Sequence, residues 1–390
     1  MSAYVRTIAE DRVFMSGRFQ NSWGDLGGVK SLAAMQNDLY DAMMNGFAIS
    51  FGDHLHPVSG LEDEVIDRIS KVFDEHKRYA PYVEGSDKVV EVGVLMRENP
   101  RNVPLYVHGI SRMLGELKIS YNVYNIHDDS DPFGKNKLII VGEELGDDDA
   151  LKEKMLDFAK RGGKFLFTGA GIDVGKKFGL VEYVESVERD TGDNAYFTFS
   201  GKEDGMRWAM YRPSRLIKNA GGTELARYVS NVFNFIWDGR QSYFYRPQGE
   251  PTEYSAVLVG ESGAAVCFDI FGAYAEAFMR EHKMLVREIF DILLPDRLIL
   301  TEGMKQSALA SVTENEKYRV LHVKATHPDI RYGKGVVEEH DYMRSSTVSV
   351  AGEYEVYVLP ERTRIESRVN NGRTFFETEE IEGYKAFLLK

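Results

Sequence analysis

Cysteine is nearly absent from this chain, because Cys267 is the single one among 390 residues. One thiol excludes an internal disulfide and a cysteine-based metal cluster. Long apolar runs are missing as well, since none approaches the ~18 residues that a membrane helix needs. No basic stretch followed by an apolar one precedes Ala3, as a secretory leader would. We therefore expect a soluble, cytoplasmic protein that has no membrane partner.

Positive charge is also scarce: 48 Lys and Arg face 61 Asp and Glu, which gives a formal net charge of −13. A nucleic-acid partner requires clustered Lys and Arg, so we expect no nucleic-acid binding. Apolar residues are abundant, at 43% of the chain with 12% aromatic residues. The length and this composition predict two or three domains with large cores.

The first eighty residues alternate apolar strands with amphipathic helices. Residues 12–16 and 47–51 are continuous apolar runs, and helices are expected over 32–45 and 62–79. Ser31 is the expected cap of the first helix. This order is typical of parallel strands that are buried on both faces. The polar loops 17–28 and 52–60 would then leave the carboxyl ends of their strands, which is the functional edge of such a sheet.

A second alternating series follows the polar stretch 84–88, where we place a domain boundary. Its rhythm predicts a doubly wound, flavodoxin-like sheet. The expected strands are 89–96, 121–126, 138–141 and 165–168, and the expected helices are 103–118 and 148–161. Residues 181–270 are more β-rich, and one long helix over 273–293 closes the domain, with an inward stripe of Phe278, Leu285, Ile289 and Leu293.

From about Lys317 the pattern alternates apolar and polar residues with a period of two. Asn371 and Gly372 lie between two such runs and predict a hairpin turn. This part of the sequence indicates a small antiparallel β domain.

Two loops carry a resemblance to a known family. The stretches "GRFQNSWGDLGG" and "SFGDHLHPVSGLED", separated by "AMQNDLYDAMMNG", resemble the last two βα units of the barrel in α-L-fucosidase-like glycoside hydrolases. In those enzymes the barrel is followed by a β-galactosidase trimerisation domain with an amidotransferase-like fold. The matching positions are Arg18, Trp23, Gly24, Asp25, Gly27, Gly28, Gly52, Asp53, Leu55, His56 and Pro57. His54 departs from the pattern, where Gln is usual.

The resemblance implies an α/β protein in three parts. Residues 1–86 would form two βα units of an incomplete (β/α)8 barrel, residues 87–312 the trimerisation domain, and residues 313–390 a small antiparallel β-sandwich. A barrel of this type closes only with eight strands. The resemblance therefore implies a companion chain that carries the missing barrel units, and a trimeric homo-oligomer.

The chemistry of the two loops is incomplete. Glycosidases need two carboxyl groups, ~5–5.5 Å apart when the enzyme is retaining and ~6.5–9.5 Å apart when it is inverting. The loops offer Asp25 and Asp53, with Glu62 and Asp63 opening the next helix. In the relatives the nucleophile is a glutamate after the seventh strand or lies on an earlier strand, and neither is present here. The catalytic residues therefore stay unassigned.

Six loop residues are the candidate substrate-binding group: Arg18, Trp23, Asp25, Asp53, His54 and His56. Trp23 could stack on a sugar face, and Arg18 and the two histidines could bond hydroxyl groups. A structural alternative is that Trp23 plugs the barrel, Asp25 caps a turn and His56 bonds backbone.

The middle domain lacks the signs of a second enzyme. Active amidotransferases place a cysteine on the turn after a strand, whereas Ala170 stands at that position in "TGAGID". Cys267 lies in an apolar run and is expected in the core. The spacing of "GAGIDVG" does not fit a dinucleotide loop, and "HDDSD" lacks the glycine and glutamate of a calcium loop. We expect no cofactor and no metal.

Two hypotheses of function remain. The first is a fragment or subunit of a glycoside hydrolase of the α-L-fucosidase or β-galactosidase type, probed with aryl fucosides and galactosides. It would contribute pocket loops and an oligomerisation domain, and it would be inactive alone. The alternative is a non-catalytic carbohydrate-binding or assembly protein derived from such an enzyme.

Overall fold

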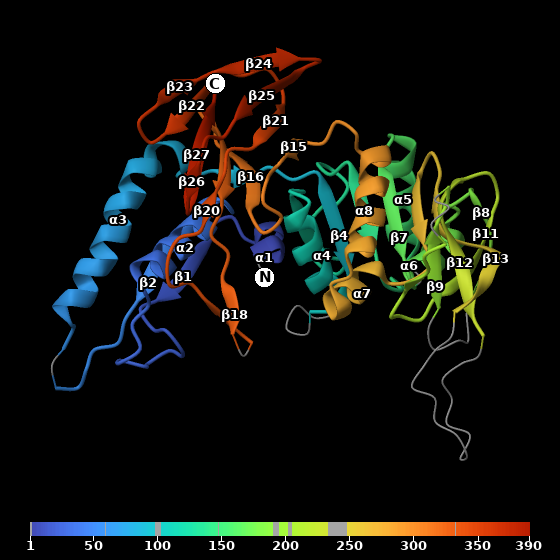
Figure 1. Ribbon diagram of the computed structural model, residues 1–390, viewed down its shortest axis with the longest axis horizontal. Helices are drawn as coiled ribbons and strands as arrows, with labels where there is room; N and C mark the ends of the chain where they lie inside the picture. Colours follow the sequence, from blue (N-terminus) through green and yellow to red (C-terminus); the bar gives the residue numbers. More distant parts are fainter. Residues whose placement is uncertain are drawn as a thin grey trace.

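The computed structural model describes residues 2–58, 60–97, 103–146, 148–189, 195–201, 205–232, 248–331 and 333–390. It is a mixed α/β structure with two lobes (Figure 1). The first and last segments of the chain share one lobe, and the middle segment forms the other. The helices are α1 (Ser2–Ile8), α2 (Leu32–Met43), α3 (Asp63–Val83), α4 (Leu105–Glu116), α5 (Asp149–Lys160), α6 (Gly171–Phe178), α7 (Ile270–Ala277) and α8 (Arg280–Leu293).

The N-terminal unit contains a two-stranded parallel sheet of β1 (Val13–Gly17) and β2 (Ala48–Gly52). Each strand is followed by a helix, α2 or α3, as the alternating pattern predicts. The N-terminal cap of α2 is confirmed, because the Ser31 hydroxyl accepts a hydrogen bond from the Ala34 amide at 2.9 Å. Helix α1 was not expected from the sequence.

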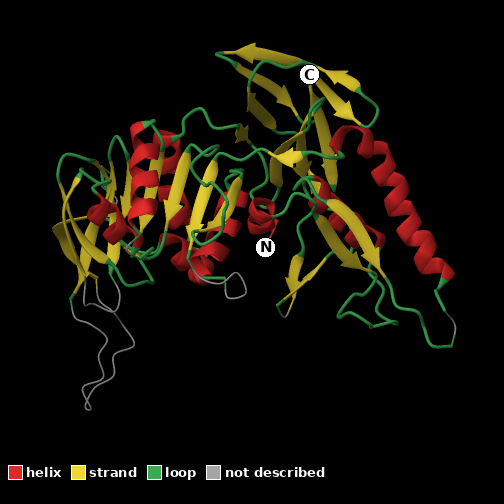
Figure 2. Cartoon of the chain, turned by 180° about the vertical axis from the view of Figure 1, so that it is seen from behind, coloured by secondary structure: helices red, strands yellow, loops and turns green. Residues whose placement is uncertain are grey.

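This parallel pair is covered on one face. Phe14 and Phe51 point toward the helices, whereas Val13 and Met15 on the opposite face are 60% and 72% exposed. Figure 2 views the pair from the side away from α2. The remaining surface of α2 and α3 packs on the C-terminal domain, so these helices lie between two sheets. That shared core contains Met35, Leu39, Tyr40, Met43, Val72, Tyr79, Val83, Val320, Leu359, Tyr384, Ala386 and Leu388.

The middle lobe is built on one large sheet. Its parallel part has the strand order β5-β4-β6-β7-β14, which is the order of a flavodoxin-like sheet, and antiparallel strands extend it beyond β14. The strands are β4 (Val92–Met96), β5 (Tyr121–Asn125), β6 (Leu138–Val141), β7 (Lys164–Thr168), β8 (Val184–Arg189), β9 (Tyr196–Phe199), β10 (Trp208–Ala209), β11 (Arg215–Asn219), β12 (Thr223–Asn231), β13 (Gln248–Val259) and β14 (Gly263–Val266).

One helix prediction in this lobe was wrong. The expected helix over 273–293 is two helices, α7 and α8, because Phe278 adopts a left-handed conformation with φ 50°. The backbone turns there, and Phe278 is 61% exposed instead of joining the inward stripe. Leu285, Ile289 and Leu293 do face the core.

The C-terminal domain is a sandwich of two antiparallel sheets. Their strand orders are β15-β21-β25-β24 and β23-β22-β27-β17-β16-β3, and Phe376 and Phe387 meet in the core between them. The strands are β3 (Asp87–Lys88), β15 (Ile299–Glu302), β16 (Leu309–Glu314), β17 (Arg319–Lys324), β18 (Asp329–Arg331), β19 (Lys334–Val336), β20 (Tyr342–Met343), β21 (Thr347–Ala351), β22 (Val356–Leu359), β23 (Thr363–Ile365), β24 (Ser367–Asn370), β25 (Arg373–Glu377), β26 (Ile381–Glu382) and β27 (Tyr384–Leu389).

Two details of this domain bear on the sequence analysis. The predicted hairpin is confirmed, since Asn371 and Gly372 have φ of 49° and 70° between the paired strands β24 and β25. The polar stretch 84–88 contains β3, which pairs with β16. Strands β15 and β16, both of which begin before residue 313, also pair within the C-terminal sheets.

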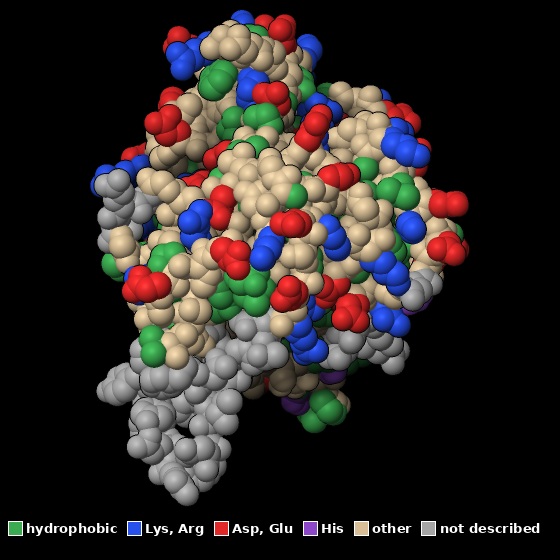
Figure 3. All heavy atoms as spheres, turned by 90° about the vertical axis from the view of Figure 1, so that its right-hand side faces the viewer, with side chains coloured by type: hydrophobic (Ala, Val, Ile, Leu, Met, Phe, Trp, Pro, Cys, Tyr) green, Lys and Arg blue, Asp and Glu red, His purple; other side chains and the backbone are tan. Residues whose placement is uncertain are grey.

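The outer surface carries mixed charge. On the face that Figure 3 shows, basic and acidic side chains are interspersed. Within the described ranges, no helix combines the length and the apolar character that crossing a bilayer requires.

Candidate substrate-binding loops

The two predicted loops meet at one edge of the β1–β2 sheet. The strands are parallel and in register to their last residues, so Gly17 lies beside Gly52. The chain then continues in contact, because the Arg18 amide donates to the Gly52 carbonyl at 3.3 Å. The loop 18–30 folds back on itself, with Phe19 bridging to Val29. The sequence prediction of two loops at a common edge is therefore confirmed.

Trp23 lies over the ends of both strands. Its side chain is 51% exposed, and its ring packs against Phe19 and His54 with centroid distances of 5.2 and 5.6 Å. A Cβ atom on Gly17 would come within 2.7 Å of the Trp23 ring, and one on Gly52 would also collide with it. The two glycines are required because the indole covers the backbone at this edge.

His54 completes the aromatic cluster. The indole Nε1–H of Trp23 donates to His54 Nε2. An indole N–H can only donate, so Nε2 of His54 carries no proton while this bond is made. The imidazole is exposed and presents its other nitrogen, Nδ1, near Gly24. Trp23 and His54 thus form one surface with an aromatic face and a polar edge.

Arg18 points into the protein. Its side chain is 1% exposed, and Nη2 donates to the Leu26 carbonyl at 2.7 Å and to Glu62 Oε2 at 2.8 Å. Nη1 lies 3.6 Å from Asp53 Oδ2. In this conformation Arg18 fastens the first loop to the second and offers no face to a ligand in solvent. This inward orientation was not predictable from local sequence, because Glu62 is 44 residues away in the chain.

The other candidates differ in their surroundings. Asp53 is 9% exposed, and its Oδ1 accepts the His54 amide at 2.7 Å. His56 is half-buried, and its Nδ1 accepts the Val58 amide at 3.2 Å. Asp25 is half-buried beside Gly28, whose amide donates to the Asp25 carbonyl at 3.1 Å. The structure therefore gathers Arg18, Asp53, Trp23 and His54 in one cluster, with Asp25 and His56 at its flanks.

A hairpin of the C-terminal domain also reaches these loops. Lys334, on β19, donates to the side chain of Asn21, and the Ser31 hydroxyl donates to the Val337 carbonyl at 2.8 Å. Figure 1 shows this hairpin, labelled β18, extending from the C-terminal domain toward the N-terminal unit. Sequence reasoning missed it, because pairing over 300 residues leaves no local pattern.

The turn after β7 carries no nucleophile. Gly169 has φ 54° there, and Ala170 precedes α6. The neighbouring Thr168 hydroxyl donates to the Phe268 carbonyl at 2.6 Å, which fastens the turn to the core. Cys267 is fully buried, as predicted. In the described part of the chain, no group of three or more His, Cys, Asp or Glu side chains could hold a metal ion.

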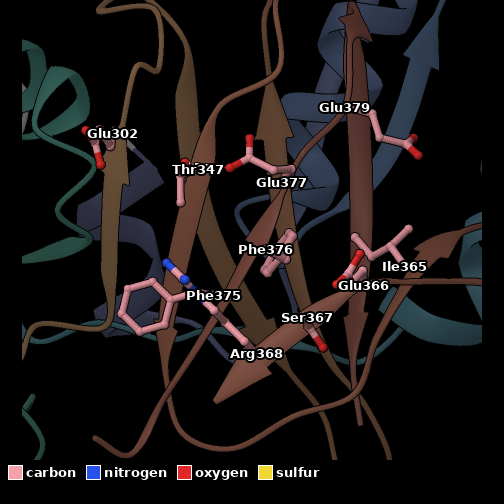
Figure 4. Close-up of a pocket in the computed structure, with 10 residues that line it drawn as sticks. All are labelled: Glu302, Thr347, Ile365, Glu366, Ser367, Arg368, Phe375, Phe376, Glu377 and Glu379. Atoms are coloured by element: carbon pink, nitrogen blue, oxygen red, sulfur yellow. Dashed lines mark hydrogen bonds between the residues drawn. The ribbon is translucent and has the colours of Figure 1, made fainter. Parts of the chain in front are cut away.

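The C-terminal domain has a separate open groove of about 510 Å³ (Figure 4). Four glutamates line it, against one basic residue, Arg368, which lies 5.6 Å from the Phe375 ring. Glu377 is already bonded, since it accepts the Thr347 hydroxyl at 2.6 Å. The lining residues are Glu302, Thr347, Ile365, Glu366, Ser367, Arg368, Phe375, Phe376, Glu377 and Glu379.

Comparison with solved structures shows the fold of the whole chain. The α-L-fucosidase isoenzyme 2 from Paenibacillus thiaminolyticus matches 100% of this chain with a TM-score of 0.86 and 19% identity. The GH42 β-galactosidase Gan42B from G. stearothermophilus matches 100% with a TM-score of 0.64 and 12% identity. The β-galactosidase from Rahnella sp. R3 matches 99% with a TM-score of 0.56 and 14% identity.

These likenesses define the class of fold. The chain has a glycoside hydrolase-like fold. It spans 62% of the length of the fucosidase and 55–56% of the two β-galactosidases. No protein-family model matches the sequence, and no curated protein does either.

Proposed function

We propose that this chain is the C-terminal part of a glycoside hydrolase of the α-L-fucosidase or β-galactosidase type. It supplies two pocket loops, an assembly domain and a β-sandwich. A companion polypeptide segment supplies the other parallel strands of the barrel and the nucleophile. The reaction is hydrolysis of an O-glycosidic bond by the two parts together.

The observation that carries this proposal is the uncovered face of the β1–β2 pair. A parallel strand is normally buried on both faces, yet Val13 and Met15 are 60% and 72% exposed. Within the described residues, neither strand pairs with any third strand. In a closed barrel that face would line the interior, and the free edges would pair with the neighbouring strands.

The arrangement of carboxyl groups supports a nucleophile from the companion segment. Asp53 is held beside the Arg18 guanidinium, and its Oδ1 is used by the His54 amide. A carboxylate that is both buried and paired is a poor nucleophile, because attack would break the pairing. Asp25 alone cannot form the carboxyl pair that glycoside hydrolysis needs.

Trp23 and His54 are the proposed contacts to sugar. A half-exposed indole stacks on the apolar face of a pyranose, and the exposed imidazole can bond a hydroxyl group beside it. Arg18 and Asp53 act as positioning residues that hold the two loops together. Asp25 and His56 flank the pocket.

The first test is an assay on aryl α-L-fucosides and aryl β-D-galactosides. The purified chain alone is expected to give no turnover, and addition of a companion chain that encodes six βα units restores it. Such a chain is sought in the adjacent reading frame. Turnover by the 390-residue chain alone would refute the proposed division of the site.

The second test is binding of the same sugars by the chain alone. Trp23→Ala is expected to weaken binding about tenfold at an unchanged melting temperature. Trp208→Ala in the middle lobe is the matched control and leaves binding unchanged. A large fall in melting temperature for Trp23→Ala, with unchanged binding, would assign Trp23 to structure instead.

A second candidate function is non-catalytic carbohydrate binding. The exposure of Trp23 and His54 favours it, because this aromatic surface exists without any companion segment. Saturable sugar binding, combined with no turnover in the presence of the companion chain, would select this candidate.

We also propose that the middle domain self-associates. Phe278 is 61% exposed at the turn between α7 and α8, and Ile292 on α8 is 49% exposed. Sedimentation analysis is expected to give an oligomer, a trimer by the family resemblance, and Phe278→Ser is expected to shift it toward the monomer. A monomeric wild-type chain would contradict the proposal.

A further inference from the structure

A second cavity lies where the two lobes meet, and its lining includes no residue of the loops 17–28 and 52–60. Its volume is about 220 Å³. Helix α1 forms one wall, and the other walls come from the end of α2, from β3, from α4 and β5, and from β16. The cavity thus touches all three parts of the chain. Its polar lining includes Arg6, Asn45, Lys88, Ser111 and Ser120.

Two cations share one neutral acceptor in this cavity. Arg6 Nη1 and Lys88 Nζ both donate to Asn45 Oδ1, at 3.0 and 3.1 Å. Arg6 also donates to Asn122 Oδ1 and to the Tyr121 carbonyl, both at 2.8 Å. In the ranges that the structure describes, neither cation forms an ion pair with a carboxylate.

The nearest carboxylates are occupied by other cations. Asp87 is paired with Arg12. Asp41 accepts from Lys324 Nζ at 2.5 Å, and that ammonium is itself buried. Arg6 and Lys88 are both half-buried and line the cavity without a carboxylate of the described residues in direct contact. Asp87 and Asp41 attract them only from beyond ion-pair distance.

This arrangement lowers the pKa values of both cationic side chains. Burial, and then the repulsion from Arg6, lower the pKa of Lys88 to about 7. Burial is also the main cause that lowers the pKa of Arg6 to about 10. Both effects would be reversed by an anion, since a negative charge favours the protonated forms.

Some hydrogen-bond donors of the lining are not used by any protein group in the described chain. The Lys88 ammonium uses one of its three N–H groups and Arg6 uses three of its five. Ser120 Oγ is buried at the wall and has no hydrogen-bond partner in the described chain. Unused guanidinium and ammonium donors around a small polar cavity fit the oxygen atoms of a tetrahedral oxyanion.

We propose that the cavity between α1, β3 and α4 binds a small tetrahedral oxyanion of the phosphate or sulfate type, held by Arg6 and Lys88. The bound anion ties α1 and the N-terminal unit to the middle domain. It therefore stabilises the junction between the lobes, by an amount that grows with the logarithm of one plus its concentration over its dissociation constant. This inference does not depend on the proposed sugar chemistry.

The experiment is titration calorimetry of the full chain with inorganic phosphate, and separately with sulfate, at pH 6.5 and constant ionic strength. Wild type is expected to show saturable binding. Lys88→Met is expected to bind phosphate at least about tenfold more weakly, because one charged donor is lost. Lys154→Met, an exposed lysine on α5, makes the same change of charge and leaves binding unchanged.

A melting measurement keeps the test independent of folding defects. In anion-free buffer Lys88→Met is expected to melt at a higher temperature than wild type, because a half-buried charge that Arg6 repels is removed while Arg6 still satisfies Asn45. Phosphate should then raise the melting temperature of wild type and not that of Lys88→Met. Equal rises with acetate, no saturable phosphate binding by wild type, or unchanged binding by Lys88→Met would each overturn the proposal.

Discussion

The parallel pair β1–β2 and the parallel sheet of the middle lobe are built from the same kind of sequence. Both use short apolar strands followed by amphipathic helices. All five residues of β4 are buried, whereas Val13 and Met15 of β1 are 60% and 72% exposed. The two sheets differ in how many of their faces are packed. The middle sheet is packed on both faces, whereas helices pack on only one face of the β1–β2 pair.

This contrast shows that the same pattern of apolar strands and amphipathic helices occurs in a sheet packed on both faces and in a pair packed on one. Val13 and Met15 are large apolar side chains at exposed positions. In the proposed barrel, further strands would cover this face. The loops that follow β1 and β2 are already ordered by bonds between them, so the open face does not prevent the local site from forming.

The largest effect is expected at the junction of the two loops. Arg18→Met leaves Asp53 as a buried carboxylate without its cation, and we expect a loss of about 3–5 kcal/mol in the free energy of unfolding of this lobe. Urea unfolding measures it. Arg78→Met, which removes an exposed ion pair with Glu361, is the control and costs no more than about 1 kcal/mol. Equal losses for the two variants would show that Arg18 does not hold the loops.

The sequence predicted the elements around these loops and not the contacts between them. Ser31 and the apolar runs define β1, α2 and β2 locally, so their existence follows from capping and periodicity. The inward turn of Arg18 depends on Glu62, and the hairpin at Lys334 depends on a pairing across the whole chain. Such contacts belong to tertiary structure, which local pattern does not encode.

The break between helices α7 and α8 at Phe278 was likewise not predictable from local sequence. No glycine or proline marks the end of α7, and the non-glycine residue there takes φ 50° between two helices that both pack on the core. The hairpin at Asn371 and Gly372 was predictable, since that dipeptide favours positive φ at both positions.

One alanine substitution in each parallel sheet tests this difference in packing directly. Leu95→Ala in β4 removes a fully buried side chain, and we expect a loss of about 2–5 kcal/mol. Met15→Ala in β1 should change the free energy of unfolding of the chain alone by no more than about 0.5 kcal/mol, because Met15 is exposed. Denaturant titration checks both. A loss above about 2 kcal/mol for Met15→Ala would mean that its face is already packed.

The middle lobe should lose stability in acid because of the buried His282. Burial lowers the pKa of His282 to about 4, below the ~6.5 of an unfolded histidine. Below pH 6.5 the unfolded chain binds a proton that the folded chain does not, so stability falls as the pH falls from 6.5 to 4. Between pH 6.5 and pH 4, the low pKa of folded His282 reduces the free energy of unfolding by about 3 kcal/mol.

His282→Gln is expected to flatten this pH dependence in the middle lobe, as followed by circular dichroism. The exposed His108 is the matched control, and His108→Gln should leave the slope unchanged. An unaltered slope in His282→Gln would assign the acid sensitivity to other groups.

The smallest effect is expected from a substitution of Gly52, which lies under the indole ring of Trp23. Gly52→Ala would place a methyl group against Trp23, and we expect a displaced ring with a cost of about 1 kcal/mol and a changed tryptophan emission. Gly27→Ala, in the loop that carries Trp23, meets no atom within 4 Å and is the neutral control. Identical emission and stability in both variants would show that Trp23 does not lie on the strand ends.

The central claim is that the open face and edges of β1 and β2 are covered by strands of a companion segment. Amide hydrogen exchange of residues 13–17 and 48–52, with and without the companion chain, tests it most directly. The account predicts that exchange at these strands slows about tenfold or more on addition of the companion, while exchange in β4 is unchanged. Strong protection of β1 and β2 in the chain alone, or restored glycoside turnover without added protection, would contradict it.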